Sequence, residues 1–278
     1  MTTRRIALVT GANQGIGFAL VAGLATRLNP EDLVLLTGRN PERVTEAVAR
    51  IDGVARVEGR VLDVTDAAAI AALADELRDE YGGVDLVVSN AIGPLTPERT
   101  QAEQADEFIA VANGGAHAVL RSFGPVLRPG GRLLVVASSL GTLDHLDAHL
   151  HPLFDGATLE QIEHAVEDWR QAIHAGTAED LGWPQWINLP SKVAQVAAVR
   201  AVAAERRSTD LSQNTLIASV CPGLVDTRAS RPWFDDFSAA RSPEDAVLPI
   251  LDLLVAGHVD PSTYGELIRD AKVVPWHG

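Results

Sequence analysis

The chain has 278 residues, of which 46% are hydrophobic and 22% charged, and its formal net charge is −14. This composition excludes a disordered chain, and the negative charge disfavours nucleic acid and anionic membranes as partners. Cys221 is the only cysteine, which excludes an internal disulfide and a metal site built on several thiolates. No apolar run has the length of a secretory signal or a membrane helix, so we expect a cytoplasmic protein.

Short apolar segments alternate along the chain with segments of helical spacing. The expected strands are residues 5–9, 33–36, 56–62, 86–88, 132–136, 215–220 and 264–273, and the expected helices are residues 16–27, 41–51, 66–81, 104–126, 192–206 and 243–254. Strands that are apolar on both faces indicate a sheet covered on both sides. The alternation predicts one α/β domain over residues 1–278, with a Rossmann-type, doubly wound parallel sheet.

Residues 142–186 interrupt this alternation. Within them, residues 158–173 predict a helix, because its apolar side chains share one stripe. The members of the stripe are Leu159, Ile162, Val166, Trp169 and Ile173. A long insertion of this kind predicts a helical lid inside the domain, placed before the next helix.

The first expected strand leads into a glycine-rich turn, Thr10-Gly11-Ala12-Asn13-Gln14-Gly15-Ile16-Gly17, and then into a helix. Glycines let the backbone approach a pyrophosphate, and the start of a helix offers free N–H groups to it. The second strand ends in Gly38-Arg39, where enzymes that use NAD usually place an acidic residue. Because arginine pairs with a 2′-phosphate, the sequence predicts NADP(H) as the cofactor.

Together these motifs resemble the short-chain dehydrogenase/reductase family over nearly the whole chain. The turn is similar to its TGxxxGxG motif, Leu62-Asp63-Val64 to its adenine-binding segment, Ser89-Asn90-Ala91-Ile92-Gly93 to its NNAG motif, and Cys221-Pro222-Gly223-Leu224-Val225-Asp226-Thr227 to the loop over the nicotinamide. The resemblance implies cofactor contacts from Gly11, Asn13, Gln14, Gly15, Ile16, Gly17, Arg39, Asp63, Val64, Asn90, Ala91, Lys192, Pro222, Gly223, Val225 and Thr227.

Catalytic roles are implied by the same resemblance. Asn113 and Ser139 occupy the places of the family's catalytic asparagine and serine, and Lys192 that of the lysine in its YxxxK motif. The tyrosine of that motif is replaced by Asn188, which can bond an oxygen but cannot protonate it. We therefore expect a catalytic set of Ser139, Asn113, Lys192 and Asn188. The only tyrosines, Tyr81 and Tyr264, lie in segments that do not predict a substitute.

Two subgroups of the family share particular features with this chain. The insertion ends in Gly182-Trp183-Pro184, as in monomeric carbonyl reductases, where it obstructs the surface used for tetramer formation. This resemblance implies a monomer. In lacking this tyrosine, the chain resembles the atypical angucyclinone ketoreductases of simocyclinone biosynthesis. That likeness implies an NADPH-dependent ketoreductase of antibiotic biosynthesis that acts on a polycyclic aromatic polyketide ketone.

Without the tyrosine, three interpretations remain open. The protein is a ketoreductase with another proton source, a catalytically inactive NADP-binding regulator, or a dehydratase or isomerase on the same fold. For a reductase, the possible proton sources are a lid histidine, water, or a hydroxyl of the substrate itself. His145, His149 and His151 are close enough in sequence to suggest a metal site, but no cysteine assists them, and we expect no metal.

Overall fold

The computed structural model describes residues 4–277, which form one eight-stranded sheet in the order β3-β2-β1-β4-β5-β6-β7-β8. Its strands are β1 (Ile6–Val9), β2 (Leu33–Gly38), β3 (Arg56–Val61), β4 (Val84–Ser89), β5 (Leu127–Val136), β6 (Leu216–Val220), β7 (Leu267–Arg269) and β8 (Lys272–Val274). Every neighbouring pair is parallel except β7 and β8. The predicted Rossmann-type parallel sheet is therefore confirmed, with an antiparallel strand added at one edge.

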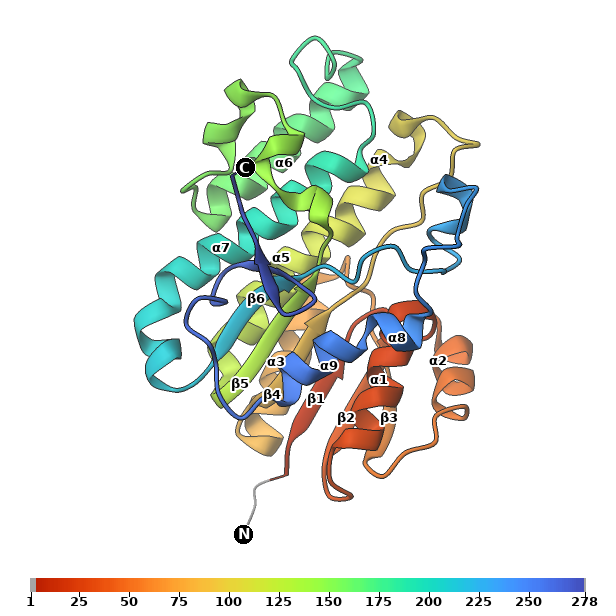
Figure 1. Ribbon diagram of the computed structural model, residues 1–278, viewed down its shortest axis with the longest axis vertical. Helices are drawn as coiled ribbons and strands as arrows, with labels where there is room; N and C mark the ends of the chain where they lie inside the picture. The colour runs from red at the N-terminus through yellow and green to blue at the C-terminus, as the bar shows by residue number, and fades with distance from the viewer. Residues whose placement is uncertain (1–3, 278) are drawn as a thin grey trace.

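Helices cover both faces of the sheet (Figure 1). They are α1 (Gly15–Arg27), α2 (Pro41–Val48), α3 (Ala67–Tyr81), α4 (Gln101–Ile109), α5 (Gly115–Phe123), α6 (Leu159–Ala175), α7 (Asn188–Ser212), α8 (Pro243–Ala246) and α9 (Leu248–Val255), with a π-helical turn η1 (Ala110–Gly114) and short 3₁₀ turns η2 (Gly124–Val126), η3 (Ser139–Gly141), η4 (Leu143–His145), η5 (Ala148–Leu153) and η6 (Arg231–Trp233). α1 packs with α8 and α9 on one face, and α5 packs between α3 and α7 on the other.

The helix boundaries follow from local capping. Asp66 accepts a hydrogen bond from the backbone of Ala69 at the start of α3, and Gly82 ends that helix in a left-handed conformation. α4 begins earlier than the apolar pattern predicts, because Thr100 and Glu103 form a reciprocal capping box. α7 also begins earlier, at Asn188. Pro190 is tolerated in its first turn, because the N–H groups of a first turn have no hydrogen-bond partner within the helix.

Two expected elements are divided. The helix expected over residues 104–126 is interrupted by η1, so α4 and α5 meet at the turn that holds Asn113. The single strand expected over residues 264–273 is instead a hairpin of β7 and β8. Asp270 and Ala271 both have positive φ, at 49° and 61°, which suits a two-residue turn between antiparallel strands. Tyr264 lies before this hairpin and outside the strands.

The insertion sits beyond the carboxyl ends of the strands, near the C-terminus (Figure 1). Its helix α6 buries the predicted apolar stripe against α4 and α7, with Trp169 only 1% exposed. Trp169 and Phe154 both contact the ring of Trp183, which closes the insertion on itself. Fully burying each large apolar side chain contributes roughly 1.5–3 kcal/mol. The insertion is therefore part of the hydrophobic core. Within residues 4–277, none of the helices combines the length and apolar character that crossing a bilayer requires.

Candidate active site

The glycine-rich turn between β1 and α1 is held from beneath by the end of β4. The hydroxyl of Thr10 accepts hydrogen bonds from the backbone N–H groups of Asn90, at 2.9 Å, and Ala91, at 3.1 Å. The Nδ2 group of Asn90 donates to the carbonyls of Thr10 and Gly11. A Cβ atom on Gly17 would lie 2.5 Å from that Nδ2 atom, so only glycine fits there. These hydrogen bonds thus connect the glycine-rich turn to the predicted motif of residues 89–93.

The start of α1 is free to bind an anion. Its N-cap residue, Gln14, makes no side-chain capping bond, and its first turn contains no acidic residue. The N–H groups and the positive end of the helix dipole are therefore available to a phosphate. The loop after β6 approaches from above, since a Cβ atom on Gly15 would lie 3.6 Å from Cγ2 of Thr227. The glycine-rich turn and the start of α1, which has no side-chain cap, together fit the pyrophosphate of a dinucleotide.

Arg39 lies at the end of β2, exposed, with its guanidinium 3.3 Å from a carboxylate oxygen of Glu107 on α4. Asp63, at the end of β3, accepts hydrogen bonds from the backbone and the hydroxyl of Thr65. These bonds, and then the charge of Arg39, hold the pKa of Asp63 below its usual range. The structure thus brings the predicted Arg39 and Asp63 to the same edge of the sheet as the glycine-rich turn. Sequence reasoning missed Glu107, because nothing in the chain order links α4 to β2.

Ser138 and Ser139 follow β5 at this edge. The backbone N–H of Ser139 donates to the sulfur of Cys221, 3.1 Å away at the end of β6. The hydroxyl of Ser138 is used within its own turn, where it accepts from Leu140. Among residues 4–277, the hydroxyl of Ser139 has no hydrogen-bond partner, and it is partly exposed. Of the two serines, Ser139 is therefore the one available to a substrate oxygen.

Asn188 begins α7 and is also partly exposed, with no side-chain hydrogen bond to any residue in the described range 4–277. Two residues earlier, the ring of Trp186 contacts that of Trp233, in the segment after β6, with the ring centroids 5.6 Å apart and the planes tilted by 41°. This contact joins the end of the insertion to the loop after β6. These two rings, called the aromatic wall below, therefore contact one another next to the segment that carries Asn188.

Lys192 lies one turn further along α7 and is buried. Its Nζ atom donates to Oε1 of Gln195 at 2.8 Å and approaches the carbonyl of Val136, at the end of β5, at 3.5 Å. Burial lowers the pKa of Lys192 from 10.5 to about 8, because removal from water penalises the charged form. A neutral amide, rather than a carboxylate, is the side chain that contacts it. Gln195 was not predicted from the sequence, although a polar residue on a buried helical face was the available signal.

Asn113 lies in η1 and is completely buried. Its Nδ2 group donates to the backbone carbonyl of Ser191 at 3.0 Å, which ties α4 to α7 beside Lys192. Its Oδ1 atom and the hydroxyl of Ser191 are both buried, and neither has a hydrogen-bond partner among residues 4–277. Asn113 thus adjoins the predicted catalytic residues but faces the protein interior. Its catalytic role remains a prediction.

The short chain dehydrogenase family profile matches residues 5–147 of this chain. Carbonyl reductase (NADPH) 1 of Mus musculus is 30% identical over 296 aligned positions, covering 99% of both chains, and the Rattus norvegicus enzyme is 32% identical over 98% and 99%. The chain belongs to the short-chain dehydrogenase family. Salutaridine reductase of Papaver somniferum has the same fold, with a TM-score of 0.78 and 22% identity over 95% of this chain and 99% of that chain.

The two tyrosines of this short-chain dehydrogenase lie away from Asn188. Tyr264 is buried near the C-terminal half of α7, where its hydroxyl donates to Asp210 at 2.7 Å. Burial and this carboxylate raise the pKa of Tyr264 far above its usual value. Tyr81 ends α3 just before β4 begins, whereas Ser139 follows the carboxyl end of β5. Neither phenol therefore lies where a substrate at the carboxyl end of β5 would meet it.

The histidines of the insertion are engaged in local contacts. His149 contacts Asp147 and the carbonyl of Leu181, and His151 contacts the carbonyl of Leu146. His145 contacts Thr142 through Nδ1. No three histidine, cysteine, aspartate or glutamate side chains are grouped as metal ligands within the described residues. Of His145, His149 and His151, His145 is the nearest in the chain to the turn that begins at Ser139.

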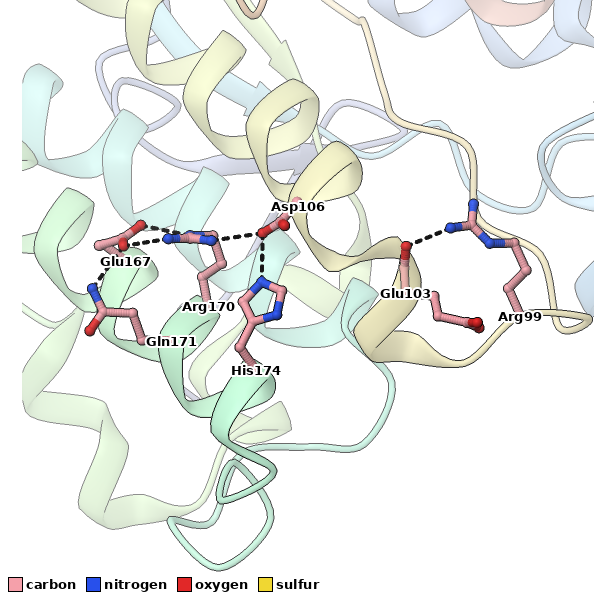
Figure 2. Close-up of polar contacts among 7 residues, drawn as sticks. All are labelled: Arg99, Glu103, Asp106, Glu167, Arg170, Gln171 and His174. Atoms are coloured by element: carbon pink, nitrogen blue, oxygen red, sulfur yellow. Dashed lines mark hydrogen bonds and ion pairs between the residues drawn. The ribbon is translucent and has the colours of Figure 1, made fainter.

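Figure 2 shows how the insertion is fastened to α4. One carboxylate oxygen of Asp106 accepts from Arg170 and contacts Nε2 of His174, both at 2.8 Å. Arg170 also makes two hydrogen bonds to Glu167, one turn earlier on α6. These ion pairs are exposed, so each contributes only about 0.2–1 kcal/mol. They set the orientation of α6, whereas apolar burial supplies most of its binding energy.

Proposed function

We propose that this short-chain dehydrogenase is an NADPH-dependent ketoreductase of a polycyclic aromatic ketone, whose proton comes from the substrate rather than from a protein phenol. The observation that carries the proposal is Asn188. It stands at the start of α7, partly exposed, four residues before the buried Lys192. Ser139 and Lys192, two residues expected of a reductase, are therefore retained, whereas Asn188 cannot titrate.

NADP(H) suits the cofactor half of the site. Its pyrophosphate would rest on the glycine-rich turn and the uncapped start of α1, and its 2′-phosphate would meet Arg39. The carbonyl reductases of mouse and rat named above carry NADPH in their names and align with almost the whole chain. The cofactor, when bound, supplies a hydride to the carbonyl carbon of the ketone.

The residues of this chain then stabilise the oxygen. The polar side chains of Ser139 and Asn188 have no hydrogen-bond partner in the part of the chain that the structure describes, so they can donate hydrogen bonds to the developing alkoxide. Lys192 lies deeper and places a positive charge against the end of β5. Asn113 contributes indirectly, because its bond to Ser191 fixes α7 relative to α4.

The alkoxide must still be protonated, and the histidines of the insertion contact other groups. An aromatic polyketide often carries a phenol beside its ketone. The pKa of such a phenol is about that of tyrosine, ~10, and it arrives already positioned next to the alkoxide. The phenol transfers its proton to that oxygen and is reprotonated from solvent. The substrate therefore replaces the missing tyrosine.

An aromatic substrate also fits the surroundings of Asn188. The rings of Trp186 and Trp233 contact one another two residues before it in the chain, and Phe234 and Phe237 contact one another in the segment that follows Trp233. Polycyclic, angucyclinone-like ketones offer flat apolar faces to such rings. We assign the reaction on this basis to aromatic polyketide tailoring in antibiotic biosynthesis, carried out in the cytoplasm. Since α6 already covers the outer surfaces of α4 and α7, we expect a monomer.

The experiment is NADPH oxidation at 340 nm with an angucyclinone that bears a phenol beside its ketone, with product analysis. We expect stoichiometric alcohol formation. Single changes of His145, His149 and His151 to alanine should each slow turnover by less than the about 10²–10⁴-fold that a general acid contributes. NADPH binding without oxidation across such ketones would favour a regulator, and product formation without NADPH oxidation would favour a dehydratase or isomerase.

A further inference from the structure

Lys192 has an unusual set of neighbours for a buried cation. It is 6% exposed, and its Nζ atom has two hydrogen-bond acceptors, the amide oxygen of Gln195 and the carbonyl of Val136. Cys221, directly after β6, is the one titratable side chain in residues 4–277 that acts electrostatically on it. A buried ammonium usually pairs with a carboxylate. Here a neutral amide supplies the shorter of the two contacts.

Gln195 uses both ends of its side chain. While Oε1 accepts from Lys192, its Nε2 group donates at 2.7 Å to the backbone carbonyl of Ala112 in η1. Gln195 is 2% exposed, so neither bond competes with bulk water. The amide therefore connects the lysine of α7 to the π-helical turn of α4, one residue before Asn113.

This bridge runs alongside a second one. Asn113 donates to the carbonyl of Ser191, so two side-chain-to-backbone bonds cross the same interface in opposite directions. A π-helical turn within a helix often marks a functional position, because it leaves backbone groups outside the regular ladder. Gln195 uses one of these carbonyls, that of Ala112. Its amide cannot rotate without breaking a buried bond, so its oxygen stays directed at Lys192.

We propose that Gln195 is a positioning residue for the proposed reductase reaction: it fixes the Lys192 ammonium at the carboxyl end of β5 and ties its position to the turn that carries Asn113. The inference rests on the proposed function for its importance in turnover, but its geometry is independent of any substrate. A neutral acceptor orients the ammonium without compensating its charge. The positive charge therefore remains available to the oxygen that Ser139 and Asn188 hold.

The chain offers a direct measurement, because Lys192 and Lys272 are its only lysines. Protein labelled with ¹³Cε-lysine should give two side-chain signals, and Lys272→Arg assigns them. We expect Lys192 to titrate near pH 8. Gln195→Glu introduces an anion beside the ammonium and should raise this midpoint by about 1–3 units. Gln195→Met removes the acceptor and should lower it.

Opposite shifts in the two variants support the proposal, since a merely structural role for Gln195 would not reverse sign. Equal Lys192 midpoints in the wild type and both variants would overturn it. If either variant does not fold, the wild-type chain still tests the proposal. The chemical shifts of the Gln195 side-chain amide must then change with pH at the same midpoint as those of Lys192. Amide signals that stay unchanged through that titration would contradict the contact.

Turnover provides the link to catalysis. If the ammonium form is needed, the alkaline limb of kcat should move upward in Gln195→Glu and downward in Gln195→Met. Val199→Ala is the matched control, because Val199 is buried one turn further along α7; it should leave the pH profile unchanged. Shifted lysine midpoints in an enzyme that reduces no ketone would sustain the positioning role and reject the reductase. Shifted midpoints with an unshifted pH profile would confine Gln195 to a structural contact and overturn its role in turnover.

Discussion

The cofactor half of the chain, residues 4–93, and the catalytic half, residues 94–277, treat buried polar groups differently. In the cofactor half, the Thr10 hydroxyl accepts two backbone N–H groups, and the buried carboxylate of Asp32 accepts those of Arg5 and Asn29. Among the described residues, the catalytic half leaves eight buried polar side-chain atoms without a hydrogen-bond partner, Oδ1 of Asn113 among them, and Lys192 has no carboxylate beside it. The cofactor half leaves one such atom, Nε of Arg60. The unmet polar groups are therefore concentrated in the catalytic half.

This difference indicates a division of labour. A cofactor cradle needs a fixed shape, and backbone-directed bonds provide it at little cost. A catalytic centre needs groups whose charge is not already neutralised by the protein. The uncompensated groups of the catalytic half reduce stability, and the surrounding hydrophobic core offsets that cost. Changes in the catalytic half should therefore affect mainly rates and pH dependence, with cofactor affinity affected as well at Lys192, which is also an expected cofactor contact. Changes in the cofactor half should affect mainly cofactor affinity.

The largest effect is expected for Lys192→Ala. Loss of the buried positive charge should lower kcat about 100-fold or more, within the range of general acid–base contributions, and should also raise the dissociation constant for NADP. Stopped-flow reduction and fluorescence titration measure the two effects. Lys272→Arg, an exposed change on β8, is the control. Unchanged turnover and unchanged NADP affinity in Lys192→Ala would show that the motif match is accidental.

His117 should make the catalytic half sensitive to acid. Burial is the main cause that lowers the pKa of His117 from 6.5 to about 4, against a smaller opposing effect of Glu163. Between those values the unfolded chain binds a proton that the folded chain does not, so stability falls as the pH drops below about 6.5. The loss should approach ~3 kcal/mol at pH 4.

Denaturant unfolding at pH 7.5 and pH 4.5 measures this loss. His117→Gln should remove most of the pH dependence, because glutamine does not titrate. His164→Gln, which changes an exposed histidine of α6, should not. A wild-type curve as flat as that of His117→Gln would show that His117 is not held neutral by burial.

Arg39→Ala probes the cofactor half. Loss of one charge-assisted contact to a phosphate costs about 1.5–3 kcal/mol, so NADPH should bind roughly tenfold more weakly or worse, with NADH almost unaffected. Glu107→Gln should act in the opposite direction and tighten NADPH, because Arg39 is then released from its ion pair. Fluorescence titration of both cofactors tests the pair of variants. Equal weakening of NADPH and NADH in Arg39→Ala would reject a 2′-phosphate contact.

The smallest effect is expected at the aromatic wall. Trp233→Ala removes the ring contact with Trp186, an interaction of about 0.5–1.5 kcal/mol, and should raise KM for a polycyclic ketone a few-fold. NADPH affinity should stay the same, since the contact lies next to the segment that carries Asn188. Steady-state kinetics with a small ketone gives the contrast. A rise in KM for NADPH instead would place this wall over the cofactor.

The two halves also differ in how far the sequence predicts them. The glycine-rich turn, Arg39 and Asp63 follow strands in chain order, and parallel strands bring their ends to one edge, so their meeting was predictable. The ion pair of Arg39 with Glu107 was not, because side chains on separate elements meet only through packing. The turn at Asp270 and Ala271 was missed as well, since neither residue is a glycine that would announce positive φ.

In the catalytic half, the sequence predicts Ser139, Asn188 and Lys192 but not their environments. The interior orientation of Asn113 depends on a π-helical turn, which hydrophobic spacing does not reveal. Gln195 is a polar residue among buried positions of α7, and only the packed structure shows that Lys192 needs it. The apolar stripe of α6 was predicted correctly. Which surface it covers is decided by α4 and α7, and so was beyond the sequence.

The central proposal is that the substrate, rather than a phenol of the protein, supplies the proton to the alkoxide. Its most direct test compares a phenol-bearing angucyclinone ketone with its phenol methyl ether, in the wild-type chain and in Asn188→Tyr. We predict that the wild type reduces the phenol and not the ether, whereas Asn188→Tyr recovers reduction of the ether. Reduction of the methyl ether by the wild type at an undiminished rate would contradict substrate-assisted protonation and require a protein acid, with His145 the first to examine.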